Sequence, residues 1–359
     1  MKIAIVHDAL CVSGGAERLV LWMSKAFPDA PVYTSVYLPQ NTFPEFRQLD
    51  VRTLPLAGGI RTERQFKLLF PLWLMLMQQQ HFADFDVVLS SSTYLAKYIR
   101  PAPSVRHVCY LYAPFRLLWK PESYSPESLP TPQAASGLVK RASSLLRNWD
   151  VKRTREIPRI ATSCHNMAQE IKQVYGVPST ILYPPVEVPS DFAEDNREDY
   201  YLSVSRLISH KRIDLAVAAC KRLGKRLIVV GDGPERARLE QMSDSRITFL
   251  GRVDDIKLRE LYRKARGLIF PSYEDYGIVP LEAQSWGTPV IAFGKGGALE
   301  TIQEGVSGIF FDRQDVDAVV AAIQRFEVSS FDTGQIHHWV SRFNVESFIN
   351  GLQTFVTTV

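Results

Sequence analysis

Short β-rich runs alternate with helical stretches along nearly the whole chain, and this alternation is the strongest constraint on its fold. It favours parallel sheets with helices on both faces. In the first half the expected strands are Ile3–Val6, Val32–Tyr37, Val51–Leu54, Val87–Leu89, His107–Leu111, Ile160–Ser163 and Thr180–Tyr183. In the second half they are Tyr200–Val204, Arg226–Val230, Ile247–Leu250, Gly267–Phe270, Pro289–Ala292 and Gly308–Phe311. The pattern occurs twice in 359 residues, which at about 100–200 residues per domain predicts two α/β domains.

A stretch rich in proline and acidic residues, Tyr183–Asp199, separates the two sets of expected strands. This composition is typical of an exposed linker between domains. We therefore expect one domain over residues 1–183 and a second over residues 184–342. A C-terminal helix over residues 343–359 is expected to pack back onto the first domain.

The composition excludes several classes of protein. With 46% hydrophobic and 22% charged residues, the chain is neither disordered nor collagen-like nor a coiled coil. Its four cysteines form no CxxC pair and have no metal-ligand spacing, which indicates buried thiols in a reducing cytosol. The first residues enter a strand pattern at once and leave no room for a signal peptide, so we predict a cytoplasmic protein.

Two segments of the basic first half suggest a membrane surface. Residues 1–160 carry 20 Lys and Arg against 12 Asp and Glu. The apolar run Leu68–Met77 follows Arg61, Arg64 and Lys67, and as a helix it would cross about half of a bilayer core. A second basic stretch contains Lys140, Arg141, Arg147, Lys152, Arg153 and Arg155. Attachment to the anionic inner face of the cytoplasmic membrane is one interpretation. A buried helix and a solvated basic face are the alternatives, and no nucleic-acid-binding motif is present.

The first candidate site residues lie where expected strands end. Gly14 and Gly15 occupy a strand-to-helix turn whose backbone N–H groups could approach a phosphate, although a plain tight turn is the alternative. The turn is not GxGxxG, which disfavours a dehydrogenase. In the second half, Arg206 and Lys211 follow the first expected strand. Two cations there could clamp a diphosphate, and an ordinary basic loop is the alternative.

Two glutamates and a glycine loop complete the candidate set. Glu274 follows the strand that ends at Phe270, and Glu282 is expected in the first turn of the next helix. A carboxylate there could accept hydrogen bonds from sugar or ribose hydroxyls, whereas capping of the helix is the alternative. The loop around Gly297 has backbone amides that could meet an anion. Because the carboxyl ends of parallel strands share one edge, these groups should lie near Arg206.

Taken together, these motifs resemble glycosyltransferase family 4, whose members are retaining enzymes of the GT-B fold. That fold has two facing, Rossmann-like, doubly wound parallel-sheet domains with a deep cleft between them. The resemblance covers essentially the whole chain and rests on Gly14–Glu17, Ser205–Leu207 with Lys211, Gly231–Pro234, Gly251–Val253, Glu274 to Glu282, Gly287–Ala292 and Gly296–Thr301. The last stretches are most similar to mannosyltransferases of surface polysaccharide assembly that use GDP-mannose.

The resemblance implies a role for each candidate residue. Arg206 and Lys211 would hold the donor diphosphate, Glu274 the transferred sugar, and Glu282 the ribose. Further donor contacts would come from Gly14, Gly15, Gly231, Arg252, Val253, Gly297, Ala298 and Leu299. The implied reaction needs neither a metal nor a cofactor, only a nucleotide diphosphate sugar as co-substrate.

One residue departs from the family pattern. Tyr112 stands where relatives often carry a histidine at the donor sugar, so it joins Glu274, Arg206 and Lys211 among the catalytic candidates. A tyrosine, with a reference pKa near 10, does not reproduce the titration of a histidine. His7 and His107 are nearby in sequence and are expected to be ordinary packed histidines.

The sequence therefore predicts a retaining hexosyltransferase, with mannose from GDP-mannose as the donor implied by the resemblance. The acceptor would be a saccharide or a polyprenyl-diphosphate-linked oligosaccharide. One alternative is a GT-B sugar-nucleotide epimerase or hydrolase. Another is a catalytically weak subunit that binds a nucleotide sugar, and Tyr112 is the reason to consider it.

Overall fold

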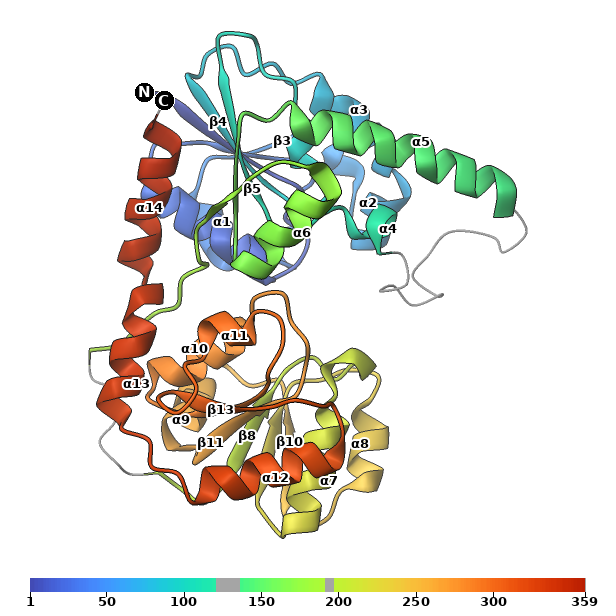
Figure 1. Cartoon of the computed structure of the whole chain (residues 1–359). Coiled ribbons are helices and arrows are strands. Elements are labelled where there is room, and N and C mark those ends of the chain that lie inside the picture. The colour runs from blue at the N-terminus through green and yellow to red at the C-terminus, as the bar shows by residue number, and fades with distance from the viewer. Residues whose placement is uncertain (121–135, 191–196, 359) are drawn as a thin grey trace. The chain divides into compact units, whose positions relative to one another are not determined.

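The chain divides into two compact units. The computed structural model describes residues 1–120, 136–190 and 197–358, with the backbone alone for residues 136–142. Unit 1 consists of Met1–Tyr183 together with Phe348–Val359, and unit 2 of Pro184–Ser347. Each unit contains one sheet with helices packed on it (Figure 1). Residues 191–196 of the expected linker lie outside the described residues.

Unit 1 is built on a seven-stranded parallel sheet in the order β3-β2-β1-β4-β5-β6-β7. Its strands are β1 (Ile3–His7), β2 (Val32–Thr34), β3 (Val51–Thr53), β4 (Val87–Ser92), β5 (Arg106–Leu111), β6 (Arg159–Thr162) and β7 (Thr180–Ile181). β1 and β4 are buried along their whole length, as expected for central strands covered on both faces. The strand order reverses between β1 and β4, so unit 1 is doubly wound.

The helices of unit 1 include one from the far end of the chain. They are α1 (Gly15–Ala26), α2 (Glu63–Leu68), α3 (Phe70–Gln78), α4 (Arg116–Trp119), α5 (Ser136–Arg155), α6 (His165–Tyr175) and α14 (Val345–Thr357). The ring of Phe348 in α14 lies 6.4 Å from that of Tyr110, centroid to centroid. The Gln353 amide donates to the Ala26 carbonyl at 2.9 Å. These contacts attach the C-terminal helix to β5 and α1.

A buried carboxylate links the two central strands of unit 1. Asp8 follows β1 and is 3% exposed. Its oxygens accept hydrogen bonds from the Ser92 hydroxyl and from the backbone N–H groups of Thr93, Tyr94, Leu95 and Ala96, at 2.6–3.1 Å. Asp8 therefore caps the turn after β4, and its carboxylate is fully occupied by the protein itself.

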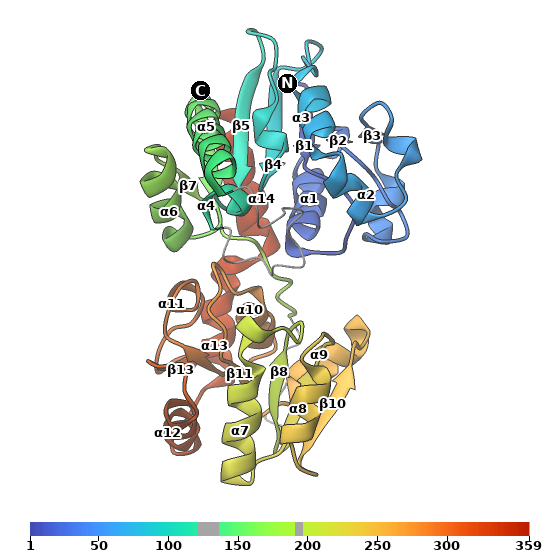
Figure 2. The same cartoon turned by 90° about the vertical axis from the view of Figure 1, so that its right-hand side faces the viewer.

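Unit 2 is built on a six-stranded parallel sheet in the order β10-β9-β8-β11-β12-β13. Its strands are β8 (Tyr201–Val204), β9 (Leu227–Val230), β10 (Ile247–Gly251), β11 (Gly267–Phe270), β12 (Val290–Phe293) and β13 (Gly308–Phe311). Its helices are α7 (Ile213–Leu223), α8 (Arg236–Met242), α9 (Asp255–Lys264), α10 (Ile278–Ser285), α11 (Ala298–Thr301), α12 (Val316–Glu327) and α13 (Thr333–Val340). The strand order reverses between β8 and β11, which lie side by side (Figure 2).

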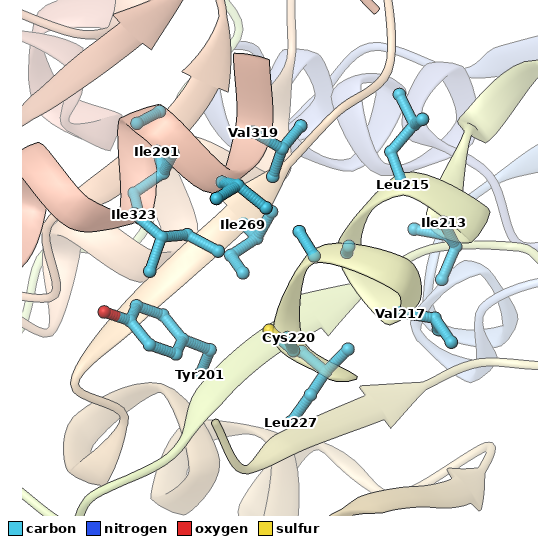
Figure 3. Packing of buried hydrophobic residues seen from close by; sticks show 14 of the residues in the cluster. Tyr201, Ile213, Leu215, Val217, Cys220, Leu227, Ile269, Ile291, Val319 and Ile323 are labelled. Carbon is cyan, nitrogen blue, oxygen red and sulfur yellow. The ribbon is translucent and has the colours of Figure 1, made fainter. Parts of the chain in front are cut away.

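Helices cover both faces of the unit 2 sheet. On one face, Cys220 of α7 and Ile323 of α12 pack against sheet residues that include Tyr201 and Ile269 (Figure 3). The other face carries a separate cluster, to which α9 contributes Tyr262. The observed strands match all thirteen expected runs, and the expectation of parallel-sheet α/β domains is confirmed.

The four cysteines are all buried, and none of them forms a disulfide. Burial raises the pKa of the Cys11, Cys109 and Cys220 thiols to about 12, so they remain protonated at neutral pH. Within the described parts of the chain, we find no helix with the length and apolar character needed to cross a bilayer.

Candidate functional site

The candidate site of unit 2 lies at the carboxyl edge of its sheet, where β8 and β11 are neighbours. In doubly wound sheets, ligands bind outside the carboxyl ends of the strands at the point where the strand order reverses. Arg206 and Lys211 follow β8, and Glu274 follows β11. Two cations, Arg206 and Lys211, and the carboxylate of Glu274 therefore lie in loops at the edge where doubly wound sheets bind ligands.

The loops after β8 and β9 are interlocked through two glycines. A Cβ on Gly231, whose φ is +124°, would lie 1.8 Å from the Ser205 carbonyl oxygen. A Cβ on Gly233 would lie 2.3 Å from the Leu207 carbonyl oxygen. The Leu207 N–H also donates to the Asp232 carbonyl at 3.0 Å. These glycines allow the two backbones to touch and so set the position of Arg206; the structure shows a packing role for Gly231.

The loops after β11 and β12 are interlocked in the same way. A Cβ on Gly297 would lie 2.2 Å from the Tyr276 carbonyl oxygen, and one on Gly296 would lie 2.5 Å from the Glu274 carbonyl oxygen. The Gly297 N–H donates to the Glu274 carbonyl at 2.9 Å. The Gly297 amide, which the sequence suggested for an anion, is thus used to hold the Glu274 loop.

An ion pair joins the two sets of loops. The Lys211 ammonium donates to the Glu274 carboxylate, and the two side chains are 13% and 27% exposed. The Ser272 hydroxyl donates to the same carboxylate oxygen at 3.3 Å. Both charged side chains are partly shielded from water, which strengthens their attraction compared with a surface pair. The expectation that Glu274 and Lys211 lie together is confirmed.

Arg206 is the second cation at this edge. It is exposed, and within the described ranges its guanidinium makes no ion pair or side-chain hydrogen bond. Lys211 is neutralised by Glu274, so Arg206 supplies the uncompensated positive charge. An exposed guanidinium in the same loop as a shielded ammonium is suited to a diphosphate.

Glu282 lies deeper in its helix than expected. Gly277, with φ +83°, ends the preceding loop, and α10 begins at Ile278 instead of Pro280. Glu282 is therefore one turn into the helix and does not cap it. Its carboxylate accepts a hydrogen bond from the Tyr262 hydroxyl at 2.9 Å. Burial and the charge of Glu282 raise the pKa of Tyr262 well above its usual value, so this hydroxyl stays protonated.

The remaining candidates of unit 2 differ in accessibility. Arg252 is exposed and Val253 half-buried just beyond β10. Ala298 is buried, with 1% exposed, whereas Leu299 is 56% exposed. Arg252 and Leu299 are thus the more accessible residues of these four. Across the described residues there is no group of three or more His, Cys, Asp or Glu side chains placed to hold a metal ion.

The glycine turn of unit 1 rests on a buried pair that the sequence did not reveal. The Glu17 carboxylate accepts a hydrogen bond from the Gly14 N–H at 3.1 Å. Its other oxygen lies 3.8 Å from Nε2 of His7, and both side chains are at most 10% exposed. Burial alone would lower the pKa of His7, but Glu17, together with Asp8 and the Ser91 carbonyl, raises it above its usual value. His7 thus supports the turn through its contact with Glu17.

Tyr112 is tied to the same region. Its hydroxyl lies 3.1 Å from the Ala16 carbonyl, to which it donates, and 2.9 Å from the Ser91 hydroxyl. Burial, followed by nearby negative charge, raises the pKa of Tyr112 well above its usual value. The Tyr112 hydroxyl therefore donates its hydrogen bond to another group of the protein. His107 is packed as expected, bonded to Ser90 at 2.8 Å, and burial lowers its pKa to about 4.

Gly14 and Gly15 should respond differently to alanine. A Cβ on Gly15 would have no heavy atom within 4 Å, so we expect Gly15→Ala to leave the unfolding temperature unchanged or slightly raised. A Cβ on Gly14 would lie 2.7 Å from the Glu17 carboxylate, and Gly14→Ala should cost about 1–3 kcal/mol. Thermal unfolding of the two variants measures this difference.

The same pair of variants separates packing from ligand contact. If Gly15 approaches a phosphate, Gly15→Ala should raise KM for a nucleotide sugar while the unfolding temperature is kept. An unchanged KM in Gly15→Ala would remove Gly15 from the candidate donor contacts.

The fold and the edge of unit 2 define a class of protein, the GT-B glycosyltransferases. The structure superposes on Anabaena HepE in complex with UDP with a TM-score of 0.73 at 18% identity, covering 100% of both chains. Residues 13–188 match the family model described as Glycosyltransferase Family 4, and residues 187–333 match the one described as Glycosyl transferases group 1. The chain belongs to the family 4 glycosyltransferases, as its motifs predicted.

Of two relatives of this chain, one is named by the sugar that it transfers and the other is not. Human alpha-1,3/1,6-mannosyltransferase ALG2 is 26% identical over 382 residues, which cover 90% of this chain and 87% of ALG2. An uncharacterized glycosyltransferase of Methanocaldococcus jannaschii is 33% identical over 138 residues. That match covers 36% of this chain and about a third, 35%, of the archaeal protein.

Proposed function

We propose that this chain is a retaining glycosyltransferase that moves mannose from GDP-mannose to a saccharide or a polyprenyl-diphosphate-linked oligosaccharide. The observation that carries the proposal is the Lys211–Glu274 pair, with Arg206 in the same loop as Lys211 after β8, at the ligand edge of the unit 2 sheet. Two cations suit the donor diphosphate, and a carboxylate suits the hydroxyls of the sugar.

The ion pair suggests how the site changes when the donor binds. In the structure Glu274 neutralises Lys211. In the proposed complex the diphosphate takes over Lys211 and also binds Arg206, and the released carboxylate accepts hydrogen bonds from the sugar. Negative charge grows on the diphosphate as the bond to the sugar breaks, so both cations lower the barrier where the charge develops. We propose that they do so without a divalent ion, and that chelators leave the rate unchanged.

The identity of the donor rests on two kinds of support. ALG2 is named as a mannosyltransferase, which supports mannose. HepE was solved in complex with UDP, which supports a nucleoside diphosphate but a different base. Thermal shift with GDP-mannose, UDP-glucose and ADP-glucose tests the proposal. We expect the largest stabilisation with GDP-mannose, and a larger shift with either other nucleotide sugar would contradict the assignment of the donor.

The two glutamates should have separable roles. Glu274→Gln removes the charge that pairs with Lys211 and should lower kcat for sugar transfer without weakening GDP binding. Glu282→Gln should weaken GDP binding itself, because the ribose is its proposed partner. Calorimetric titration of GDP together with initial rates measures both effects. An equal loss of GDP affinity in the two variants would show that the roles are wrongly assigned.

Tyr262 offers a control for the Glu282 assignment. Tyr262→Phe removes the hydrogen bond that holds the Glu282 carboxylate but keeps its charge. We expect Tyr262→Phe to lose less GDP affinity than Glu282→Gln does. The kcat for sugar transfer, which we assign to Glu274, should stay unchanged.

A further inference from the structure

Helices α2 and α3 bury only one of their faces. On that face Phe66, Trp73 and Met77 belong to the core of unit 1. The Trp73 indole donates to the Phe66 carbonyl at 3.1 Å, and the two rings are stacked with centroids 6.3 Å apart. These contacts fix the rotation of both helices, so the opposite face has a defined orientation.

That opposite face is apolar and exposed. Leu68, Leu69 and Met75 are 65%, 41% and 52% exposed, and Pro71 between them is exposed as well. Pro71 and Met75 are four residues apart and share one side of α3, and Leu68 and Leu69 lie just before them at the end of α2. We call Leu68, Leu69, Pro71 and Met75 the α2–α3 patch; Figures 1 and 2 show the two consecutive helices that carry it. Large apolar side chains gathered at a surface mark a site of contact.

Cations border the α2–α3 patch at both ends. Arg61, Arg64 and Lys67 precede it, and Glu63, which pairs with Lys67 at 2.7 Å, is the one acidic residue between positions 61 and 83. At the other end a hollow of about 350 Å³ is lined by Arg100 together with Pro71, Leu74, Met75, Gln78 and Gln79. An apolar patch flanked by guanidinium and ammonium groups is complementary to acyl chains flanked by phosphates.

We propose that the α2–α3 patch docks this protein on an anionic lipid bilayer. The leucines and the methionine would enter the boundary between headgroups and acyl chains, and the cations would lie on the lipid phosphates. Helix α3 has nine residues and is about 14 Å long, so it lies in the interface instead of crossing the bilayer. The excess of cations selects anionic lipid over a neutral surface. The inference does not depend on the proposed donor or acceptor.

The second basic segment, on α5, is a weaker candidate because its arginines already bond to other groups of the protein. Arg147 and Arg155 each donate to a backbone carbonyl at 2.7 Å, that of Leu118 and that of Tyr175 respectively. Arg153 pairs with Glu156. The side chains of Lys140 and Arg141 lie outside the described residues. Leu145 and Leu146 are 71% and 47% exposed, which makes them a matched control for the patch.

Co-sedimentation of the full chain with phosphatidylcholine vesicles, with and without phosphatidylglycerol, tests the proposal. The protein should bind the anionic vesicles at low salt, be released as the Debye length shortens to about 8 Å at 0.15 M, and ignore the neutral ones. Leu68→Gln/Leu69→Gln/Met75→Gln should lower the partition coefficient by about tenfold or more. Arg61→Gln/Arg64→Gln/Lys67→Gln should lower it about fivefold per cation removed.

The controls decide between the two segments. Leu145→Gln/Leu146→Gln should bind anionic vesicles as the unmodified chain does. All variants change exposed side chains, so their unfolding temperatures should stay close to that of the unmodified chain. The proposal is overturned if no vesicles are bound, or if the α5 variant loses binding while the patch variant keeps it. It is also overturned if the patch variant binds vesicles as before and differs only in the molar mass of the protein measured by light scattering. The last result would assign the α2–α3 patch to contact between protein chains.

Discussion

Lys211→Ala should lower kcat/KM for the nucleotide sugar by about 10²- to 10³-fold, the usual effect of losing one preorganised donor to a developing negative charge. The same change leaves Glu274 without its partner, so its unpaired carboxylate would face the donor diphosphate. Arg206→Ala should have an effect of similar size, because it removes the guanidinium that has no partner within the described ranges. Initial rates at varied donor concentration, with GDP titration, measure both losses.

A second lysine–glutamate pair of unit 2 is the matched control. Lys257 pairs with Glu260 at 2.8 Å on the exposed side of α9, and neither residue is among the candidate donor contacts. Lys257→Ala should keep kcat/KM within about twofold, because an exposed pair contributes little to stability. Lys211→Arg should recover part of the rate, since the charge is kept. Near-normal turnover in both Lys211→Ala and Arg206→Ala would contradict the assignment of the diphosphate site.

Asp150→Asn should destabilise unit 1 by about 3–5 kcal/mol, because it leaves the buried Lys97 ammonium without its counter-charge. Both side chains are fully buried, 2.6 Å apart. The Asp150 carboxylate also accepts hydrogen bonds from Tyr98 and Trp119 at 2.8 and 2.7 Å, and from Tyr175 at 2.9 Å. Chemical denaturation followed by tryptophan fluorescence measures the loss.

The double variant and the pH dependence refine this expectation. Lys97→Met/Asp150→Leu should be more stable than either single variant, since no unpaired buried charge remains. Burial alone would raise the pKa of Asp150, but the charge and hydrogen bond of Lys97 lower it below its usual value. Its stabilisation is therefore present above about pH 4 and is lost as the pH falls through the lowered pKa. A loss below 1 kcal/mol in Asp150→Asn would show that the pair does not hold unit 1 together.

The strands could be predicted because their signal is local. Runs such as Val87–Leu89 and Gly267–Phe270 are apolar on both faces, as central parallel strands require, and the structure contains both. The run Leu68–Met77 is ambiguous because a local pattern does not show which side of an apolar helix meets the core. The structure shows that Trp73 and Met77 are buried while Leu68 and Met75 are exposed.

The candidate site could be predicted in part. Lys211 and Glu274 follow adjacent strands, so topology alone predicted that they would lie together. His7 with Glu17, and Tyr262 with Glu282, join elements whose packing no sequence pattern specifies. Glycines were the least informative residues, because a close approach to a ligand and a close approach to another loop need the same missing Cβ. The structure shows that Gly231 approaches another loop.

Transfer of label from GDP-[¹³C]mannose into an acceptor fraction tests the central claim most directly. We expect the amount of GDP released to equal the amount of mannose bound to acceptor, and the new linkage to keep the α configuration of the donor. Labelled free mannose or an epimerised nucleotide sugar would instead indicate the hydrolase or the epimerase, and an inverted linkage would exclude the retaining mechanism. Donor binding with no turnover in the presence of an acceptor extract would contradict the account, and would favour the weak subunit that Tyr112 first suggested.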